Sequence, residues 1–384
     1  EILLKVAHPG FDSTDISRRH HIGLEESMGY QYDQMRFWNV AGLPVPLVFD
    51  FGKGDHGGVA HYYLAMEFWD GNTHDLNVLA LDQYERNAAR DGKNQQSFVE
   101  SEKKNIITSS LEAIRMFHVI GTKEAKAREV NVFFTDDLHK YFVEDRGRLY
   151  FDRYLRLKLG ADASNIGSML ESFCQVLIPF LEPFSEVEKY FYSQGDEYLH
   201  HFQYRQHSNG HRVTGIFDAD HAMMTRPEYS LAKLLTSHLL DLSLEQELGY
   251  VEPTFFSSDA PQGERYLGLG PSRNSMRSYV LVSLATRLFD IGKRASHALR
   301  EDYANTQIVT GLTFKPHKIA FPLKRYIHPS VSYPGVKESI GVQTRALQDR
   351  LNKIEQGELR GVLYPRDVEH VKDLHNLLSR NNLL

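Results

Sequence analysis

Two aspartates that lie 22 positions apart carry the chemistry that this sequence suggests. Asp196 stands in the polar segment 194–201, and Asp218 follows an apolar, strand-like run. Between them, Asn209-Gly210 separates two strand-like runs, and this dipeptide favours a tight hairpin turn because both residues tolerate a positive φ. A hairpin brings its two ends together, so we expect both carboxylates to face one pocket. One could deprotonate or orient an attacking hydroxyl while the other binds a metal ion, as phosphoryl transfer requires.

The composition is that of an ordinary globular protein with enough chain for two lobes. Of the 384 residues, 41% are hydrophobic and 24% are charged, and the net charge of −6 gives no basic field that would indicate nucleic-acid binding. No apolar run reaches membrane-spanning length, and no signal peptide is visible. The single cysteine, Cys174, excludes an intrachain disulfide and indicates a reducing, intracellular compartment. Because the chain opens on Glu1 within a strand-like run, we expect that an upstream segment was lost, which leaves the cytoplasm and an organelle open.

The hydrophobic pattern predicts an α+β chain. We expect a strand at residues 2–6 with Lys5 at its centre, a helix at 23–40, and paired strands at 47–51 and 61–68. Most of the chain from there to about residue 191 has a helical pattern. Beyond residue 249 the pattern is looser, with a proline-rich segment at 314–336 that we expect to be extended. Charged amphipathic helices end the chain, and one of them has an apolar stripe that must be buried against its own domain or a partner; the stripe consists of Val368, Val371, Leu374 and Leu378.

Several short motifs follow one another in a characteristic order. They are Leu4-Lys5-Val6, Gly42-Leu43-Pro44-Val45-Pro46, Y-L-A-M-E-F-W-D-G at 63–71, I-R-M-F-H at 114–118, Gln194-Gly195-Asp196, and G-I-F-D-A-D-H-A at 215–222. Together they resemble the aminoglycoside phosphotransferase and choline kinase branch of the protein-kinase-like fold, and P-E-Y at 227–229 resembles a helix start of fungal members. The resemblance covers residues 1–240. It implies a truncated N-lobe at 1–70, a mostly helical C-lobe at 71–250 and a helical, proline-rich extension at 251–384.

The resemblance also implies a role for each candidate residue in ATP-dependent phosphoryl transfer to a hydroxyl of a small molecule. Lys5 would bind the ATP phosphates, and Asp196 would be the catalytic base. Taken alone, Lys5 could equally face solvent, and an aspartate at a hairpin end is usually a capping or solvated residue. The hinge residues Glu67 and Phe68 would bind adenine, although an ordinary strand is an equal alternative for this segment. His118 would pack in the core. Asp218, Asp220 and His201 would bind Mg²⁺, with Mn²⁺ as an alternative ion, and Asp220 could instead accept hydrogen bonds beside the metal ion.

Some positions depart from the family pattern. Gln194 and Tyr198 replace histidines, His201 replaces an asparagine that binds metal, and Gln31 replaces the helix glutamate that would pair with Lys5. Imidazole is a poor ligand for Mg²⁺, although it accepts Mn²⁺ or Zn²⁺. The loop that would cover the phosphates is absent from this sequence. These departures support a second hypothesis, in which the protein is an inactive pseudokinase that serves as a structural or interaction subunit and binds a protein partner through residues 338–384.

Overall fold

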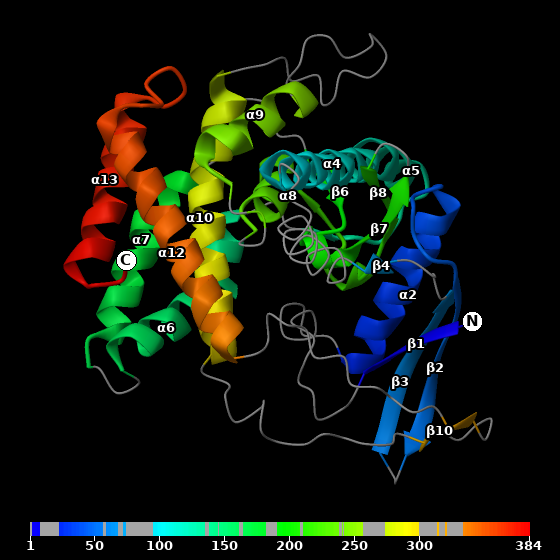
Figure 1. Cartoon of the computed structure of the whole chain (residues 1–384). Coiled ribbons are helices and arrows are strands. Elements are labelled where there is room, and N and C mark those ends of the chain that lie inside the picture. Colours follow the sequence, from blue (N-terminus) through cyan, green and yellow to red (C-terminus); the bar gives the residue numbers. More distant parts are fainter. Residues whose placement is uncertain are drawn as a thin grey trace. The chain divides into compact units, whose positions relative to one another are not determined.

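The chain divides into two compact units, each assembled from segments that are far apart in the sequence. Unit 1 comprises Glu1–Phe134, Phe191–Met224 and Gln307–Ile327, and unit 2 comprises Thr135–Tyr190, Thr225–Thr306 and His328–Leu384. The domain boundaries that the sequence suggested at residues 70 and 250 stay predictions. The computed structural model (Figure 1) describes residues 2–7, 23–56, 59–67, 72–73, 95–134, 138–144, 146–160, 164–181, 190–207, 210–237, 240, 242–255, 273–298, 313–314, 319–320 and 333–384.

Unit 1 contains a three-stranded antiparallel sheet with the strand order β1-β3-β2. Its strands are β1 (Ile2–Ala7), β2 (Val48–His56) and β3 (Val59–Glu67). In this register, Lys5 of β1 pairs with Leu64 of the central strand β3, and the Leu64 side chain is fully buried. The three predicted strands of the N-lobe are confirmed, except that Phe68 lies outside the described residues.

Helix α2 (Leu24–Val40) packs against β2 and β3, as Figure 1 shows. It buries Met28, Met35 and Trp38, which recur at helical spacing. Gly42 ends the helix with a φ of +74°, a left-handed conformation that glycine adopts without steric cost, and the Leu43 N–H then donates to the Trp38 carbonyl at 3.0 Å. The predicted helix and its end are confirmed.

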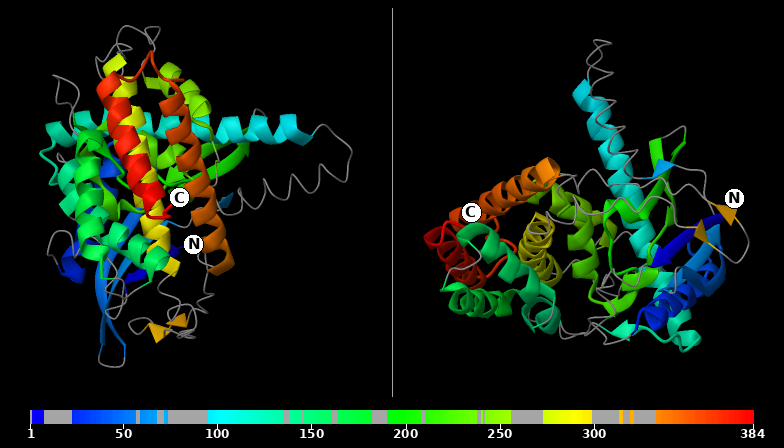
Figure 2. Two further views of the ribbon diagram at one scale, coloured as in Figure 1. Left: turned by 90° about the vertical axis from the view of Figure 1, so that its left-hand side faces the viewer. Right: turned by 90° about the horizontal axis from the view of Figure 1, so that it is seen from below.

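The predicted hairpin of the two aspartates is present as β7 (Phe202–His207) and β8 (Gly210–Ile216). The predicted turn at Asn209-Gly210 involves residue 209, which, like residue 208, lies outside the described residues. Helix α4 (Gln95–Met116) packs on β8, as Figure 2 shows, and the Ser109 hydroxyl accepts a hydrogen bond from the Val213 N–H at 2.6 Å. The ends of the hairpin are therefore held from one side by a long helix. The other described strands of unit 1 are β4 (Asn72–Thr73), β5 (Phe133–Phe134), β6 (Phe191–Ser193), β9 (Met223–Thr225, which ends at the first residue of unit 2), β10 (Thr313–Phe314) and β11 (Ile319–Ala320). Its other described helices are the π-helix η1 (Phe117–Gly121), α5 (Thr122–Ala127) and the short 3-10 helices η3 (Leu199–His201) and η4 (Ala219–His221).

Unit 2 is helical in its described part, and its core forms around helix α10 (Arg273–Ala298). Helices α6, α7, α8 and α12 all pack against α10. The helix is buried along most of its length because its apolar side chains are not confined to one face; Leu281, Leu284 and Ile291 are all buried. The other described helices of this unit are the π-helix η2 (Lys140–Glu144), α6 (Arg146–Leu159), α7 (Ile166–Leu181), α8 (Pro227–Leu235), α9 (Leu244–Phe255), α12 (Tyr333–Gln356) and α13 (Pro365–Arg380).

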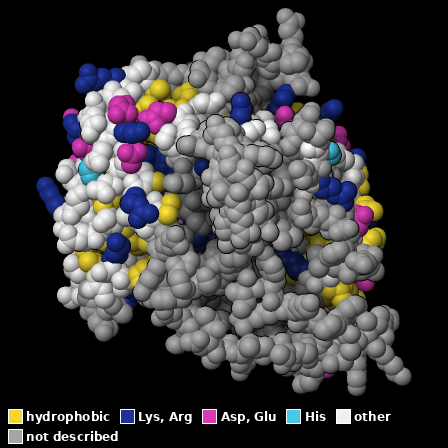
Figure 3. All heavy atoms as spheres, in the orientation of Figure 1, with side chains coloured by type: hydrophobic (Ala, Val, Ile, Leu, Met, Phe, Trp, Pro, Cys, Tyr) yellow, Lys and Arg dark blue, Asp and Glu magenta, His cyan; other side chains and the backbone are white. Residues whose placement is uncertain are grey.

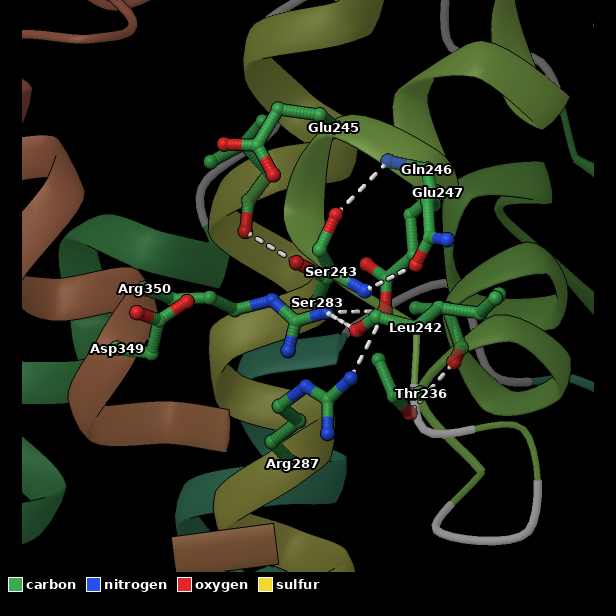
Figure 4. A network of polar contacts seen from close by, with 12 residues as sticks. Thr236, Leu242, Ser243, Glu245, Gln246, Glu247, Ser283, Arg287, Asp349 and Arg350 are labelled. Atoms are coloured by element: carbon green, nitrogen blue, oxygen red, sulfur yellow. Dashed lines mark hydrogen bonds and ion pairs between the residues drawn. The ribbon is translucent and has the colours of Figure 1, made fainter. Parts of the chain in front are cut away.

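A fully buried group of charged side chains joins α9, α10 and α12 (Figure 4). One carboxylate oxygen of Glu247 accepts hydrogen bonds from Arg287 at 2.8 Å and from Arg350, and the other accepts one from the Tyr279 hydroxyl at 3.1 Å. Burial, together with repulsion from Arg350, lowers the pKa of Arg287 to about 10. A single carboxylate thus compensates two guanidinium groups in the interior of unit 2.

The apolar stripe of the last helix is covered by the chain itself. Val371, Leu374 and Leu378 are fully buried, and α13 packs against α7 and α12. On the face that Figure 3 shows, Lys and Arg side chains lie interspersed with Asp and Glu on unit 2. Val368, the fourth residue of the stripe, is half-buried. Three of the four stripe residues are therefore covered within unit 2, and binding of a partner through residues 338–384 stays a prediction.

These elements make the chain an α+β protein with a small N-terminal antiparallel sheet and a mostly helical remainder, as predicted. Among the described residues, no helix combines the length and the hydropathy needed to cross a lipid bilayer. Cys174, the single cysteine, is buried in α7.

Candidate active site

Asp218 lies at the centre of a cluster of functional groups in unit 1. One of its carboxylate oxygens forms an ion pair with the ammonium of Lys5, which is 213 positions away in the sequence. The other carboxylate oxygen lies 3.5 Å from Nε2 of His201. Two of the predicted site residues are therefore in direct contact, and a third lies next to them. The first strand and the hairpin end are brought together as the sequence suggested.

His201 links Asp218 to Asp196, the predicted catalytic base. Its Nδ1 lies 2.6 Å from the backbone carbonyl oxygen of Asp196 and 3.6 Å from the Oδ2 of that residue. A carbonyl oxygen can only accept a hydrogen bond, so Nδ1 carries a proton and donates it. Both His201 and Asp196 are buried. The two acidic loops are thus joined by one imidazole ring.

Gln194 holds the two acidic loops in register. Its side-chain carbonyl accepts a hydrogen bond from the Asp196 N–H at 2.9 Å, and its amide donates to the carbonyls of Phe217 at 3.1 Å and Asp218 at 2.7 Å. An amide can do this because it is both a donor and an acceptor. From the sequence, Gln194 counted only as a departure from the family pattern, whereas it positions both aspartates.

The backbone of the two loops adopts conformations that few residues tolerate. Gly195 has a φ of +82°, and a Cβ added there would lie 1.8 Å from the carbonyl oxygen of His221. Its N–H donates to Ser193 and Glu197, each at 2.9 Å. Asp218 has a φ of 64°, a left-handed value that aspartate reaches more easily than most residues. The loops are therefore closely fitted to one another, and glycine is required at position 195.

Helix α2 supports the segment that follows Asp218. The Tyr30 hydroxyl donates to the Ala222 carbonyl at 2.6 Å, and the Tyr192 hydroxyl, just before the Asp196 loop, donates to Gln34 at 2.6 Å. Because Tyr192 is fully buried, its pKa is raised well above the ordinary value, so its hydroxyl stays protonated as a donor. The helix thus positions both acidic loops from one side.

His118 packs behind the site, as predicted. It is fully buried, and its ring lies 5.8 Å from that of Phe191, which begins the short strand leading to the Asp196 loop. Burial lowers the pKa of His118 to about 3, so the ring is neutral at physiological pH. It has a structural role in the core beside the loop.

The remaining predicted residues stand apart from this cluster or lie outside the described part. Gln31, which stands where the family has a helix glutamate, is buried in α2, and the carboxylate that pairs with Lys5 comes from Asp218 instead. Glu25, an acidic residue in the first turn of α2, accepts a hydrogen bond from the Tyr62 hydroxyl at 2.8 Å. The Glu67 N–H donates to the Leu47 carbonyl at 2.7 Å, so this N–H is engaged within the sheet. Phe68 and the side chain of Asp220 lie outside the described residues. The roles of Glu67, Phe68 and Asp220 stay predictions.

The donor atoms present suit a metal ion that is shared with another molecule. Within the described part of the chain, no group of three or more His, Cys, Asp or Glu side chains is placed to hold a metal ion by itself. Asp218 and His201 nevertheless present one oxygen and one nitrogen toward each other. Metal ions that act with nucleotides are commonly held by one or two protein ligands plus phosphate and water oxygens, and a pair of donors is compatible with that arrangement.

Comparisons with known proteins yield similar structures only. No family model matches the chain, and no curated protein matches it. The GDP complex of an aminoglycoside 2'-phosphotransferase-IIIa matches with a TM-score of 0.45 and 13% identity, over 85% of this chain and 84% of that one. A choline/ethanolamine kinase family protein from Mesorhizobium loti matches with a TM-score of 0.44 and 10% identity, over 97% and 86%. An aminoglycoside phosphotransferase from Streptomyces rimosus, in complex with ADP and streptomycin, matches with a TM-score of 0.40 and 13% identity, over 74% and 86%. The groups that the motifs resemble thus recur among the similar structures, and the narrower resemblance to fungal members stays a prediction.

Proposed function

We propose that this protein is a metal-dependent phosphotransferase that moves the terminal phosphoryl group of ATP to a hydroxyl of a small molecule. The observation that supports this proposal is the cluster in which Lys5, Asp218, His201 and Asp196 meet from distant parts of the sequence. It combines a cation for phosphate, a carboxylate for a metal ion and a second carboxylate for a proton, which are the components that this reaction requires. The hydroxyl acceptor follows from the resemblance of the motifs.

Each residue would have a separate task. The Lys5 ammonium would bind phosphate oxygens, and Asp218 would hold the metal ion, which when bound neutralises charge on the phosphates. Asp196 would accept the proton of the acceptor hydroxyl as its oxygen forms a bond to phosphorus and the bond to the departing ADP breaks. The hydrogen bonds of Gln194 to both loops would keep the base and the metal ligand at a fixed separation.

The ion pair between Lys5 and Asp218 has a consequence for this cycle. The same carboxylate that would bind the metal neutralises the lysine in the protein by itself. Phosphate oxygens offer Lys5 an alternative partner, so nucleotide binding would release Asp218 for the metal ion. We therefore expect ATP and the metal ion to bind more tightly together than either does alone, because coupling between two ligands is reciprocal.

Thermal unfolding with ATP, measured with Mg²⁺ and separately with Mn²⁺, tests the proposal. A ligand that binds only the folded state stabilises it by about 2.7 kcal/mol at 100 times its dissociation constant, so binding should raise the melting temperature measurably. Asp218→Asn should abolish the metal-dependent part of this rise. Asp50→Asn is the matched control, since Asp50 is an exposed carboxylate of β2 in the same unit and should leave the rise unchanged. No stabilisation by millimolar ATP with either metal would refute the proposal.

The alternative from the sequence is an inactive pseudokinase that serves as an interaction subunit. This hypothesis was based on the positions that depart from the family pattern and on the apolar stripe near the end of the chain. Because three of the four residues of that stripe are buried within unit 2 and Gln194 holds both aspartates in place, the described residues favour the catalytic proposal.

A further inference from the structure

The ring of His201 is oriented in a way that a purely structural histidine does not require. Its Nδ1 donates to the Asp196 carbonyl at 2.6 Å, which fixes both the position of the proton and the plane of the ring. In the neutral ring, the lone pair is therefore on Nε2. This nitrogen faces Oδ2 of Asp218 at 3.5 Å. The nitrogen that carries the lone pair and a carboxylate oxygen, both electron-rich, thus lie 3.5 Å apart.

Two electron-rich atoms at this separation are a suitable pair of ligands for one cation. When each bond to the ion is about 2.0–2.2 Å long, two ligands of the same ion lie roughly 3.0–3.5 Å apart, depending on the coordination angle. A histidine that binds a metal usually donates its other ring N–H to a carboxylate or a backbone carbonyl, which is the bond that Nδ1 makes here. Hydrogen bonds from Gln194 and the Phe217 N–H, which donates to the His201 carbonyl at 2.8 Å, hold the two donors in place.

We propose that His201 Nε2 and Asp218 Oδ2 form a mixed nitrogen and oxygen site that takes a first-row transition ion, such as Mn²⁺, in preference to Mg²⁺. Mg²⁺ prefers oxygen ligands and gives up its water reluctantly, whereas first-row transition ions accept imidazole nitrogen. This site is the metal site of the proposed function, and the preference names the class of ion that it takes. It rests on the proposed function only because nucleotide phosphates would complete the coordination.

Mn²⁺ binding to the whole chain without nucleotide, followed by electron paramagnetic resonance, is the direct test, at concentrations high enough for the ion to compete with the Lys5 ammonium for Asp218. No bound Mn²⁺ at millimolar concentration would overturn the inference. Pulsed spectra of the bound ion should show coupling to a ¹⁴N nucleus, and Mg²⁺ should displace Mn²⁺ only in large excess. His201→Asn should remove the nitrogen coupling and weaken Mn²⁺ binding by about ten-fold or more while changing Mg²⁺ binding by less than about three-fold. Asp218→Asn should weaken the binding of both ions.

The matched control is His207→Asn. His207 is an exposed histidine at the end of β7, the strand that follows His201, and its replacement should leave the affinity and the nitrogen coupling unchanged. Thermal unfolding of each variant without metal identifies any loss of folding. The spectrum of the unaltered protein needs no variant, so it decides the question even if His201→Asn does not fold.

Bound Mn²⁺ without nitrogen coupling would overturn the inference, as would equal affinities for Mn²⁺ and Mg²⁺ in the unaltered protein. A ring that bridges the two aspartates as an imidazolium would give the first of these results. Failure of the proposed function gives a different pattern. In that case nitrogen-coupled Mn²⁺ would still bind, but ATP would not stabilise the protein with either metal.

Discussion

Removing the negative charge of Glu247 should destabilise the protein severely. In the buried group of unit 2, this carboxylate accepts hydrogen bonds from both Arg287 and Arg350, so Glu247→Gln raises the net charge of the three side chains from +1 to +2. Glutamine has nearly the same volume and keeps one acceptor oxygen, so the change creates no cavity. Breaking a buried ion pair by neutralising one partner typically costs about 3–5 kcal/mol, because the remaining charge stays in the interior without compensation.

Glu245→Gln is the control, because this residue lies on the same helix two positions earlier. Glu245 is 52% exposed and pairs with Lys353 at 3.0 Å. Exposed pairs contribute about 0–1 kcal/mol, so the two substitutions should differ by roughly 3 kcal/mol in the free energy of unfolding. Urea titration followed by circular dichroism measures this difference for the helical unit 2. Tryptophan fluorescence follows unit 1 separately, since both tryptophans of the chain belong to that unit.

Equal losses for the two variants, or a loss below about 1 kcal/mol for Glu247→Gln, would refute the reasoning, because either would mean that water or rearrangement compensates the arginines. A triple variant separates charge from packing. Replacing Glu247 by Leu and both arginines by Met removes the three charges of this group while keeping similar volumes, and such replacements are often neutral or stabilising. The triple variant should therefore be more stable than Glu247→Gln.

Two further predictions concern the surroundings of the active site. The pKa of His118 is about 3 in the folded state and about 6.5 in the unfolded state, so its contribution to stability is complete above pH 6.5 and falls by about 1.4 kcal/mol for each pH unit below it. In urea titrations from pH 7 to 4, the free energy of unfolding should therefore decline less steeply for His118→Phe than for the unaltered protein. Parallel declines of the two proteins would contradict this. Gly195→Ala should destabilise the protein by several kcal/mol and remove any stabilisation by ATP, because its Cβ would overlap the His221 carbonyl. Gly167→Ala, in a helix with open space around it, should instead be neutral or stabilising by up to about 1 kcal/mol, and similar losses for the two glycines would show that the contact at position 195 is unimportant.

The elements that carry the site were predictable from local patterns. Continuous apolar runs gave the strands, helical spacing gave α2, and a turn dipeptide between two strand-like runs gave the hairpin that brings Asp196 and Asp218 together. The order of the motifs indicated that Lys5 and Asp218 belong to one site, but it did not predict that their side chains form an ion pair. Local patterns work here because each depends on residues that are close together in the sequence.

Features that depend on tertiary partners were not predictable in the same way. Gln194 was interpreted as a loss because the role of an amide depends on which donors and acceptors the fold places around it. Glu247 looked like any acidic residue of an amphipathic helix, and only the arginines brought by α10 and α12 distinguish it from its neighbour Glu245. The stripe of α13 predicted burial correctly, but its pattern contains no information on which surface covers it.

The ion pair between Lys5 and Asp218 also has a consequence for the order of folding. Bringing together two residues separated by 213 positions costs about 5 kcal/mol in chain entropy, from the logarithmic dependence on loop length. The two side chains are 36% and 28% exposed, and a pair so exposed contributes about 1 kcal/mol at most. The pair therefore cannot draw its two segments together, and it forms only after the sheet, α2 and the hairpin have docked. A fluorescent donor near Lys5 and an acceptor near Asp218 would accordingly report the last stage of assembly. During synthesis, the ribosome must have released the chain well beyond residue 218 before the site can form.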